Sequence, residues 1–314
     1  MIRVSTGARL HLGFYNIATE DGHAYGGVGV AIDRPRVVVE VEPSHTLVVE
    51  NRSTEPIDDV VDNVVKSLDV STVRIRVLEC IPRHVGLGST TQLSLALATA
   101  ISILRGWSED PYRLAQLVGR GFVSGIGVAS FTYGGFVIDG GTTMDKLKHG
   151  AGSYVPRPIV RVPFPEEWRF VLLIPFDKRG LSEEEEREIL TKVEIPPLEL
   201  RYEMLRYVFL GMLRAVVMRD HVLFAKSLDR LQIAVGRYFA KFQGGIFVSQ
   251  HLVEALRSMG IEGVGQSSWG PTIYGFVENE ERAQNVASRI RSMVSRVNVL
   301  VVKPRNRGYE IVKK

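Results

Sequence analysis

Residues 81–91 read Ile81-Pro82-Arg83-His84-Val85-Gly86-Leu87-Gly88-Ser89-Thr90-Thr91. This stretch joins an alternating strand that ends near Cys80 to an amphipathic helix. Gly86 and Gly88 permit positive φ angles and close approach of a ligand, and a helix that begins near Ser89 directs N–H groups and its positive dipole end to the same point. The pattern predicts a phosphate or diphosphate site, and a tight strand-to-helix connection without a ligand is the alternative.

Composition and charge narrow the class of protein. The chain has 314 residues, of which 45% are hydrophobic and 24% charged, which is enough for one large or two medium globular domains. The longest nearly apolar run, residues 93–104, is shorter than the roughly 20 residues of a membrane span. The first five residues do not resemble a signal peptide, so we expect a cytoplasmic protein that contacts no membrane.

Cysteine and charge usage exclude other sites. Cys80 is the single cysteine, which rules out an intrachain disulfide and a cysteine zinc cluster and favours a packed thiol over a nucleophile. The net charge of +4 favours an anionic ligand. Because the basic residues are dispersed, the sequence favours phosphorylated small molecules over nucleic acid.

The order of elements predicts two mixed α/β domains. The expected features are strands at 37–42 and 73–77, a helix at 56–65, a buried helix at 89–104, a glycine-rich block at 119–141, an irregular linker at 146–165, a strand at 170–174, a helix capped by Ser182 and Glu185, helical stripes at 205–217 and 224–239, a strand pair within 264–277, a helix at 280–293 and a strand at 297–302. From residue 168 this is close to a βαββαβ order with extra helices. We expect one domain at 1–165 and another at 166–314.

Three segments resemble motifs of one superfamily. Residues 82–91 resemble the Pro-x-x-x-Gly-Leu-Gly-Ser-Ser phosphate loop of the superfamily named for galactokinase, homoserine kinase, mevalonate kinase and phosphomevalonate kinase, the GHMP superfamily. Residues 5–13 and 263–275 stand where those enzymes have an N-terminal motif and a glycine-rich C-terminal motif. The resemblance implies an α/β (α+β) fold of two domains: an N-terminal left-handed βαβ sandwich with the phosphate loop, and a C-terminal ferredoxin-like domain with extra helices. It places the ligand in the cleft between them.

Two departures separate the chain from the kinases. The mevalonate kinase branch has an aspartate that activates the substrate hydroxyl where this chain has Gly127. Those kinases often carry Pro-Gly-Lys in the N-terminal motif, whereas this chain has Thr6-Gly7-Ala8 and places its positive charge at Arg9. The resemblance therefore implies retained phosphate binding without phosphoryl transfer.

A narrower resemblance accounts for these departures. Residues 9–11, 26–31, 119–141 and 266–272 look like the β-ribofuranosylaminobenzene 5′-phosphate synthases of archaeal methanopterin biosynthesis, and Trp269 stands where kinases have small residues. The resemblance implies joining of phosphoribosyl pyrophosphate to 4-hydroxybenzoate or 4-aminobenzoate through carbon, with release of carbon dioxide and pyrophosphate. It also implies a homodimer and magnesium, with no nucleotide cofactor.

The resemblance and the chemistry assign residues to roles. Substrate and phosphate contacts are expected from Arg83, His84, Gly86, Leu87, Gly88, Ser89, Thr90, Gly125, Ser267, Ser268 and Gly270. The candidate catalytic residues are Arg9, His11 and Trp269, where Arg9 would bind the leaving diphosphate and Trp269 would stack on the aromatic ring. His11 would bond a phosphate or the para substituent. A half-buried strand histidine and a core tryptophan are the alternatives for His11 and Trp269.

The metal ligands are the least specific part of the pattern. Asp139, among glycines, and Ser89, at the start of the helix, are the candidate magnesium ligands, and a turn-capping role is the alternative for Asp139. Two other functions stay open from sequence: an ATP-dependent small-molecule kinase of the same superfamily, and an anion- or RNA-binding protein without catalysis. Low aromatic content in the basic segments argues against RNA binding.

Overall fold

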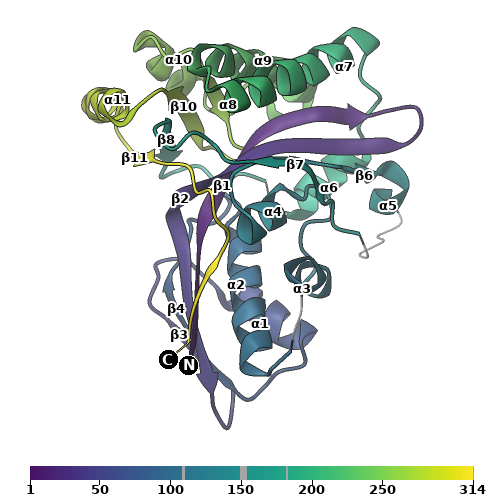
Figure 1. Ribbon diagram of the computed structural model, residues 1–314, viewed down its shortest axis with the longest axis vertical. Coiled ribbons are helices and arrows are strands. Elements are labelled where there is room, and N and C mark those ends of the chain that lie inside the picture. The colour runs from purple at the N-terminus through teal and green to yellow at the C-terminus, as the bar shows by residue number, and fades with distance from the viewer. Residues whose placement is uncertain (108–109, 149–153, 182, 314) are drawn as a thin grey trace.

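A computed structural model describes residues 1–107, 110–148, 154–181 and 183–313 (Figure 1). The N-terminal half is built on two long strands, β1 (Ile2–Ala18) and β2 (His23–Pro43), which pair antiparallel along their length. Sheet order is β12-β1-β2-β4-β3; β5 and β6 pair with the N-terminal part of β2, and β7 pairs with β5. Helix α2 packs on β1 and β2, and α1 and α3 lie beside it in Figure 1.

The remaining elements of this half are β3 (Val48–Asn51), α1 (Asp58–Ser67), β4 (Val73–Glu79), α2 (Ser89–Leu104), α3 (Pro111–Leu117), α4 (Ile126–Thr132), β5 (Phe136–Asp139), β6 (Thr142–Thr143), α5 (Met144–Lys148) and β7 (Pro158–Val162). Strands β3 and β4 pair in parallel around α1, which is the βαβ unit that the resemblance implies. The left-handedness of this crossover stays a prediction.

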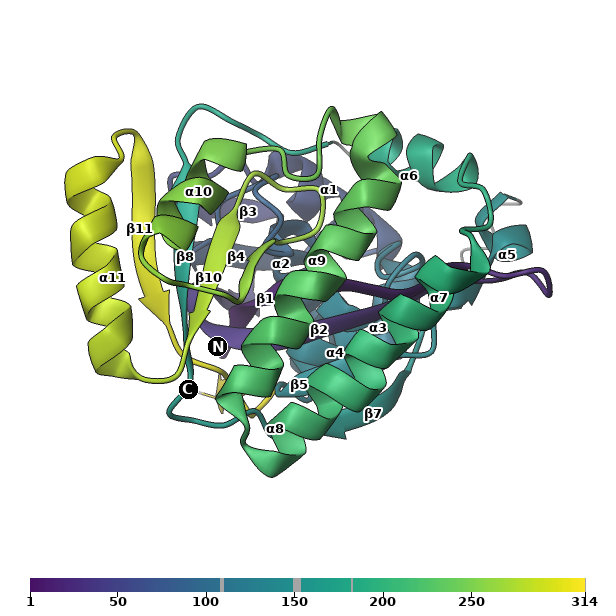
Figure 2. The same ribbon diagram turned by 90° about the horizontal axis from the view of Figure 1, so that it is seen from above.

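The second sheet has the ferredoxin-like order β11-β8-β10-β9, with every pair antiparallel. Its elements and the inserted helices are β8 (Arg169–Pro175), α6 (Glu183–Thr191), α7 (Leu198–Leu205), the π-helix η1 (Arg206–Leu213), α8 (Arg214–Met218), α9 (His221–Gln243), α10 (Gln250–Ser258), β9 (Val264–Gln266), β10 (Ile273–Val277), α11 (Glu280–Met293) and β11 (Val297–Val302). Figure 2 shows α10 and α11 against this sheet, with α9 running toward β1 and β2. The expected ferredoxin-like domain is confirmed.

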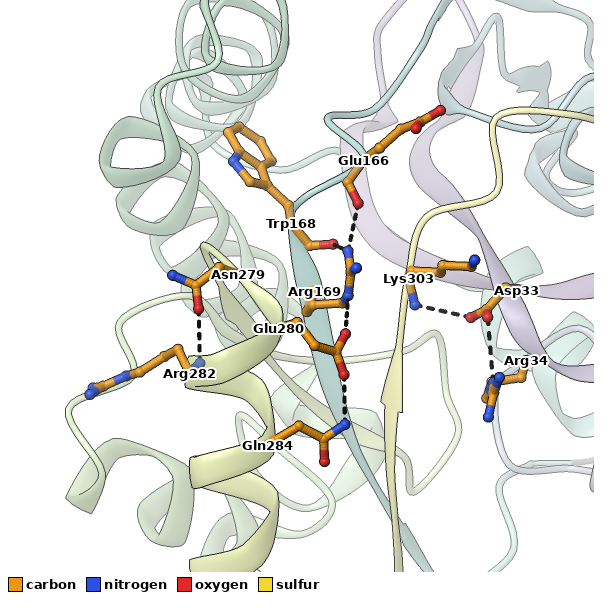
Figure 3. Close-up of polar contacts among 10 residues, drawn as sticks. All are labelled: Asp33, Arg34, Glu166, Trp168, Arg169, Asn279, Glu280, Arg282, Gln284 and Lys303. Atoms are coloured by element: carbon orange, nitrogen blue, oxygen red, sulfur yellow. Dashed lines mark hydrogen bonds and ion pairs between the residues drawn. The ribbon is translucent and has the colours of Figure 1, made fainter.

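Local sequence accounts for several of these boundaries. Helix α11 begins at its Asn279 cap, whose side-chain oxygen accepts the Arg282 N–H at 2.8 Å. Figure 3 shows the neighbouring contacts: Arg169 Nε of β8 donates to Glu280 at 2.5 Å, and Lys303 N–H donates to Asp33 of β2 at 3.0 Å. The start of α11 is thus held to β8, an inner strand of the second sheet. The chain after β11 is held to β2 of the N-terminal sheet.

The last strand, β12 (Glu310–Lys313), pairs with β1, so both termini lie side by side (Figure 1). The expected division at 165 and 166 stays a prediction, although the end of the chain belongs to the first sheet. Aromatic side chains also join the two halves: the ring centroids of Phe164 and Phe224 lie 5.2 Å apart, and Phe224 in turn packs on Phe276 of the second sheet, with centroids 4.7 Å apart. Burial of these rings in one shared cluster holds the domains together.

Two expectations need correction. The stretch 146–165 is not an irregular linker throughout, because β7 pairs with β5 inside it. Pro158 is tolerated in β7 because this half-buried strand lies at the edge of the sheet. The stripe at 205–217 is helical but contains the π-turns of η1. The expected cap at Ser182 lies outside the described residues.

Cys80 is partly buried, and burial raises the pKa of its thiol to about 11, in keeping with a packed thiol. No helix in the described part of the chain is both long and apolar enough to span a membrane.

Candidate active site

The phosphate loop lies between β4 and α2, as the sequence predicts. Gly86 and Gly88 adopt φ angles of 84° and 79°. Gly88 is the N-cap of α2 and, as a glycine, supplies no side-chain cap to the first turn of this helix. The amides that begin at Ser89 and the positive helix end therefore face the loop pocket, which is an arrangement that favours an anion.

The loop is held by the turn between β9 and β10. The Ser267 hydroxyl donates to the Gly86 carbonyl oxygen at 2.6 Å and accepts the His11 N–H at 3.1 Å. A Cβ on Gly86 would lie 2.1 Å from the Ser267 carbonyl oxygen, and one on Gly270 would lie 2.2 Å from the Gly86 nitrogen. The N-terminal and C-terminal motifs thus form one unit.

Arg9 lies against this unit. Its Nη1 donates to the Gly86 carbonyl oxygen at 2.5 Å, and its backbone N–H donates to the Leu87 carbonyl oxygen at 3.2 Å. Its Nε is buried and has no hydrogen-bond partner among the described residues. Burial lowers the pKa of Arg9 to about 10, opposed by the Glu186 carboxylate, so the guanidinium remains charged at neutral pH. A buried cationic donor without an acceptor is suited to an anionic ligand.

Two adjoining pockets meet at this place. The first, here called the phosphate pocket, is lined by Arg9, His84, Gly86, Gly88, Ser89, Thr90, Thr91, Arg120, Gly180, Leu181, Glu186, Ser268, Trp269 and Gly270. The second, here called the aromatic pocket, is lined by His11, Gly13, Phe14, Gln232, Val235, Gly236, Phe239, Gln243, Ile246, Gln266, Ser268 and Trp269. Ser268 and Trp269 belong to both.

The aromatic pocket has ring walls from both halves of the chain. Trp269 packs edge-on against Phe239 of α9, with ring centroids 4.9 Å apart, and His11 packs edge-on against Phe14 at 4.8 Å. The cavity volume of this pocket is about 50 Å³, which is below the roughly 300–1,000 Å³ typical of small-molecule sites. The ring walls of the pocket are chemically suited to an aromatic ligand.

His11 is a neutral wall of the aromatic pocket. Burial, with the nearby Arg9 charge, lowers its pKa to about 3. Its Nδ1 accepts the Gly13 N–H at 3.3 Å, so the proton resides on Nε2, which lies 3.3 Å from the Ser124 hydroxyl. Both ring nitrogens have protein partners, so His11 presents its ring to the pocket rather than a free nitrogen.

Asp139 is a structural anchor. Its carboxylate is fully buried and accepts the N–H groups of Gly27 (2.8 Å), Gly125 (2.7 Å) and Gly141 (3.0 Å), as well as the Ser124 hydroxyl (3.1 Å). Desolvation by burial raises its pKa to about 6 in spite of these donors. Since four donors saturate the two oxygens, this geometry supports the turn-capping alternative over a metal ligand.

Other predicted residues also lie away from the pockets. Arg83 donates to Asp59 of α1, at 2.8 Å for the Nη2 contact, and to the Pro56 carbonyl oxygen at 3.1 Å. Leu87 is buried in the core, and the Ser267 hydroxyl is already hydrogen-bonded to the Gly86 carbonyl oxygen of the loop. A Cβ on Gly125 would lie 1.9 Å from the Pro156 carbonyl oxygen. These four residues line neither pocket and support the residues that do.

The structure adds residues that sequence reasoning missed. Arg120, Gly180 and Glu186 line the phosphate pocket, and Phe14 and Phe239 line the aromatic pocket. Arg120 had a usable signal, because it is a lone charge between two glycines. Phe239 had none, since it continues a helical stripe that core packing explains equally well.

Gly127 shows how the chain departs from a kinase. A Cβ at this position would lie 3.2 Å from the Thr91 methyl group, and the buried Gln92 Nε2 donates to the Gly127 carbonyl oxygen at 2.8 Å. A side chain at position 127 would therefore pack tightly against α2.

Comparison with known proteins agrees with this geometry. Residues 56–135 match the family model of the GHMP kinase N-terminal domain, and residues 212–296 match that of the GHMP kinase C-terminal domain. A β-ribofuranosylphenol 5′-phosphate synthase of Methanothermobacter thermautotrophicus is 33% identical, with 99% of this chain and 98% of that protein covered. The protein of the same name from Archaeoglobus fulgidus is also 33% identical, with 99% of each covered. The chain belongs to the β-ribofuranosylphenol 5′-phosphate synthase family.

Solved structures place the β-ribofuranosylphenol 5′-phosphate synthase family within the GHMP fold. A homoserine kinase from Cytophaga hutchinsonii matches with a TM-score of 0.70 at 19% identity, covering 99% of this chain and 97% of that one. A mevalonate pyrophosphate decarboxylase from Streptococcus pyogenes matches with a TM-score of 0.68 at 14% identity, covering 98% and 97%. At these identities the likeness concerns the fold alone.

Proposed function

We propose that this chain joins phosphoribosyl pyrophosphate to 4-hydroxybenzoate through carbon, with loss of carbon dioxide and pyrophosphate, as a step of methanopterin biosynthesis. The observation that carries the proposal is the junction of a phosphate pocket and an aromatic pocket at Ser268 and Trp269. The relatives are named for a phenol product. That name favours 4-hydroxybenzoate over 4-aminobenzoate.

The proposed reaction forms one carbon–carbon bond and breaks two bonds. The ring carbon that bears the carboxylate attacks the anomeric carbon of the ribose while the bond from that carbon to pyrophosphate breaks, and the pyrophosphate takes the electron pair. The bond to the carboxylate then breaks, its electrons restore the aromatic ring, and carbon dioxide leaves. The phenol hydroxyl already enriches this carbon in electrons, so no protein base is required, which fits Gly127 in place of an aspartate.

The chain's own residues bind, orient and exclude water. Arg9 Nε and the amides at the start of α2 would hold the departing diphosphate, because its negative charge grows as the bond breaks. Phe14, Phe239 and Trp269 would position the ring beside the anomeric carbon. The apolar walls would keep water from the electron-poor sugar centre.

Magnesium fits the phosphate pocket. Hard oxygen donors are present there in the Ser89 and Thr90 hydroxyls and the Glu186 carboxylate. Mg²⁺ binds mainly through substrate phosphates with one or two protein oxygens, so Ser89 and Glu186 would suffice to hold it. When bound, it would neutralise charge on the diphosphate. Among the described residues no cluster of three or more histidine, cysteine or acidic side chains forms a separate metal site.

The proposal includes a cytoplasmic homodimer that needs no nucleotide cofactor and binds no nucleic acid. Incubation of the purified protein with magnesium, phosphoribosyl pyrophosphate and 4-hydroxybenzoate should release carbon dioxide and pyrophosphate in equal amounts. Absence of both products would contradict it.

The kinase alternative is favoured by one observation, the GHMP phosphate loop shared with homoserine kinase. It predicts tight ATP binding and phosphoryl transfer to an alcohol. Calorimetry with ATP and with pyrophosphate separates the two functions, since only the synthase is expected to bind pyrophosphate more tightly than ATP.

A further inference from the structure

A third cavity, here called the basic pocket, lies apart from the candidate active site. Its volume is about 730 Å³, against about 50 Å³ for the aromatic pocket and about 110 Å³ for the phosphate pocket. It therefore falls within the roughly 300–1,000 Å³ typical of small-molecule sites. Its lining residues, none of which lines the other two pockets, are Ser5, Thr6, Asp33, Arg34, Pro35, Arg36, Arg52, Ser53, Thr54, Glu79, Cys80, Lys303, Arg305, Arg307 and Glu310. The proposed reaction leaves this cavity without a role.

Backbone contacts fix one wall of the basic pocket. The Asp33 N–H donates to the Lys303 carbonyl oxygen at 3.0 Å, and the Lys303 N–H donates to the Asp33 carboxylate at 3.0 Å, a contact that Figure 3 shows. The Arg305 N–H donates in the same way to the Ala31 carbonyl oxygen at 2.8 Å. The segment after β11 is therefore bound along β2 and holds its charged side chains at the cavity.

Gly7 of β1 gives one of these side chains its place. A Cβ at Gly7 would lie 3.1 Å from Arg305 Cδ and 2.0 Å from the Ile32 carbonyl oxygen. The Arg305 side chain packs over this glycine and is only 12% exposed. A side chain at position 7 would crowd Arg305 where it lines the basic pocket.

The basic pocket carries an excess of positive charge. Six lining residues are cationic and three are anionic: Arg34, Arg36, Arg52, Lys303, Arg305 and Arg307 against Asp33, Glu79 and Glu310. Glu50, which does not line the pocket, pairs with Arg52 at 3.5 Å, so two positive charges stay unmatched even when it is counted. Excess positive charge in a concave site raises the local concentration of anions.

The carboxylates of the pocket are already engaged. Each contacts an arginine of the same pocket, with N–O distances of 3.4 Å for Arg34–Asp33, 2.5 Å for Arg36–Glu79 and 3.0 Å for Arg307–Glu310. The Lys303 ammonium, in contrast, has no ion pair or hydrogen bond with any described residue. Lys303 is therefore the cation best placed to serve a ligand.

The lining also defines the class of anion. All of the lining residues are described, and none has an aromatic or large aliphatic side chain. The pocket thus offers no ring on which a nucleobase stacks and no apolar socket for a peptide side chain. Hydroxyl groups of Ser5, Ser53 and Thr54 stand with the guanidinium and ammonium groups, and this combination suits phosphate oxygens.

We infer that the basic pocket binds a phosphorylated small molecule without an aromatic ring, at a site separate from the candidate active site. A phosphorylated sugar and inorganic pyrophosphate share this chemistry, because each offers two or more negative charges to the unmatched cations. The inference goes beyond the proposed function and does not depend on it, since no residue of the phosphate pocket takes part.

Calorimetry on the full chain tests this, with pyrophosphate and ribose 5-phosphate as separate probes. For at least one of them we expect a site whose affinity falls at least about tenfold in Lys303→Gln, as the loss of one charged hydrogen bond predicts. Lys226→Gln is the matched control, because Lys226 is an exposed lysine of α9 that lines none of the three pockets. The same site should keep its affinity in Arg9→Lys, which alters the phosphate pocket alone.

The probe that fills the Lys303-dependent site identifies the source of the phosphate group. Absence of such a site for both probes overturns the inference, as does equal weakening by Lys226→Gln or by Arg9→Lys. ADP supplies a further arm, because it carries a diphosphate together with an aromatic base. Tighter binding of ADP than of pyrophosphate at the Lys303-dependent site overturns the assignment to a ligand without an aromatic ring.

Discussion

Gly86 and Gly270 lie in backbone contact, although they come from opposite halves of the chain. A Cβ on Gly86 would be 2.8 Å from the Gly270 Cα, and a Cβ on Gly270 would be 2.2 Å from the Gly86 nitrogen. The close approach lets the Ser267 hydroxyl reach the Gly86 carbonyl oxygen. The glycine loop at 86–88 therefore has its shape only when both domains are folded and docked.

Gly86→Ala should destabilise the protein and abolish pyrophosphate binding. The added methyl meets the Ser267 carbonyl oxygen at 2.1 Å and must also adopt a φ of 84°. Gly119→Ala is the matched control, because its φ is 72° but nothing lies within 4 Å of its Cβ. Urea unfolding should show a loss of about 1–2 kcal/mol for the control, from backbone strain alone. A similar loss for both variants would contradict the docking described here.

Arg9→Lys should weaken pyrophosphate binding by about 10- to 100-fold, because lysine lacks the buried Nε donor and charged hydrogen bonds contribute about 1.5–3 kcal/mol. Arg83→Lys is the control, since Arg83 pairs with Asp59 and lies outside both pockets. It should lower the free energy of unfolding while binding changes less than about threefold. Calorimetry with pyrophosphate measures both. Equal weakening of pyrophosphate binding in both variants would indicate that Arg83 also contributes to the binding site.

Phe239→Leu should raise the KM for the aromatic acid by about tenfold with little change in pyrophosphate binding, because Phe239 lines only the aromatic pocket. Phe242→Leu on the same helix removes a ring that does not line it. Steady-state kinetics for both variants should separate ring recognition from general loosening of α9. A shift in pyrophosphate affinity with Phe239→Leu alone would contradict the division into two pockets.

The pH dependence of stability should report the buried His11. The unfolded chain takes up a proton near pH 6.5, while folded His11 stays neutral to about pH 3, so its contribution to stability is lost as pH falls through this window. The pKa of Asp139 is raised on folding from 3.8 to about 6, so this group makes the protein more stable as pH falls. The same contribution is present in a His11 variant and cancels when the two proteins are compared. The stability of the unaltered protein relative to His11→Gln should thus fall by about 2 kcal/mol from pH 7.5 to 5.0, at 1.4 kcal/mol per unit. Urea unfolding of both proteins at both pH values measures this difference. An equal change in the free energy of unfolding for the two proteins would contradict the prediction.

Much of the fold follows from local patterns. The helix expected at 280–293 and the strand expected at 297–302 agree with α11 and β11, because an N-cap, helical spacing and β-branched residues act within a few positions. The phosphate loop was predicted for the same reason, since positive φ at Gly86 and Gly88 is a property of those residues. The strand β7 was missed because its pairing with β5, not its proline-containing sequence, creates it.

The sequence by itself determined that a glycine loop precedes a helix, and that glycine replaces the kinase aspartate at position 127. Only the tertiary structure decided which of two arginines, Arg9 or Arg83, lines the phosphate pocket, that Asp139 is enclosed by backbone amides, and that Phe239 and Trp269 form one wall. Turn and helix preferences are carried by neighbouring residues. Burial, charge pairing and ring packing depend on groups brought together from distant parts of the chain, and no local pattern encodes them.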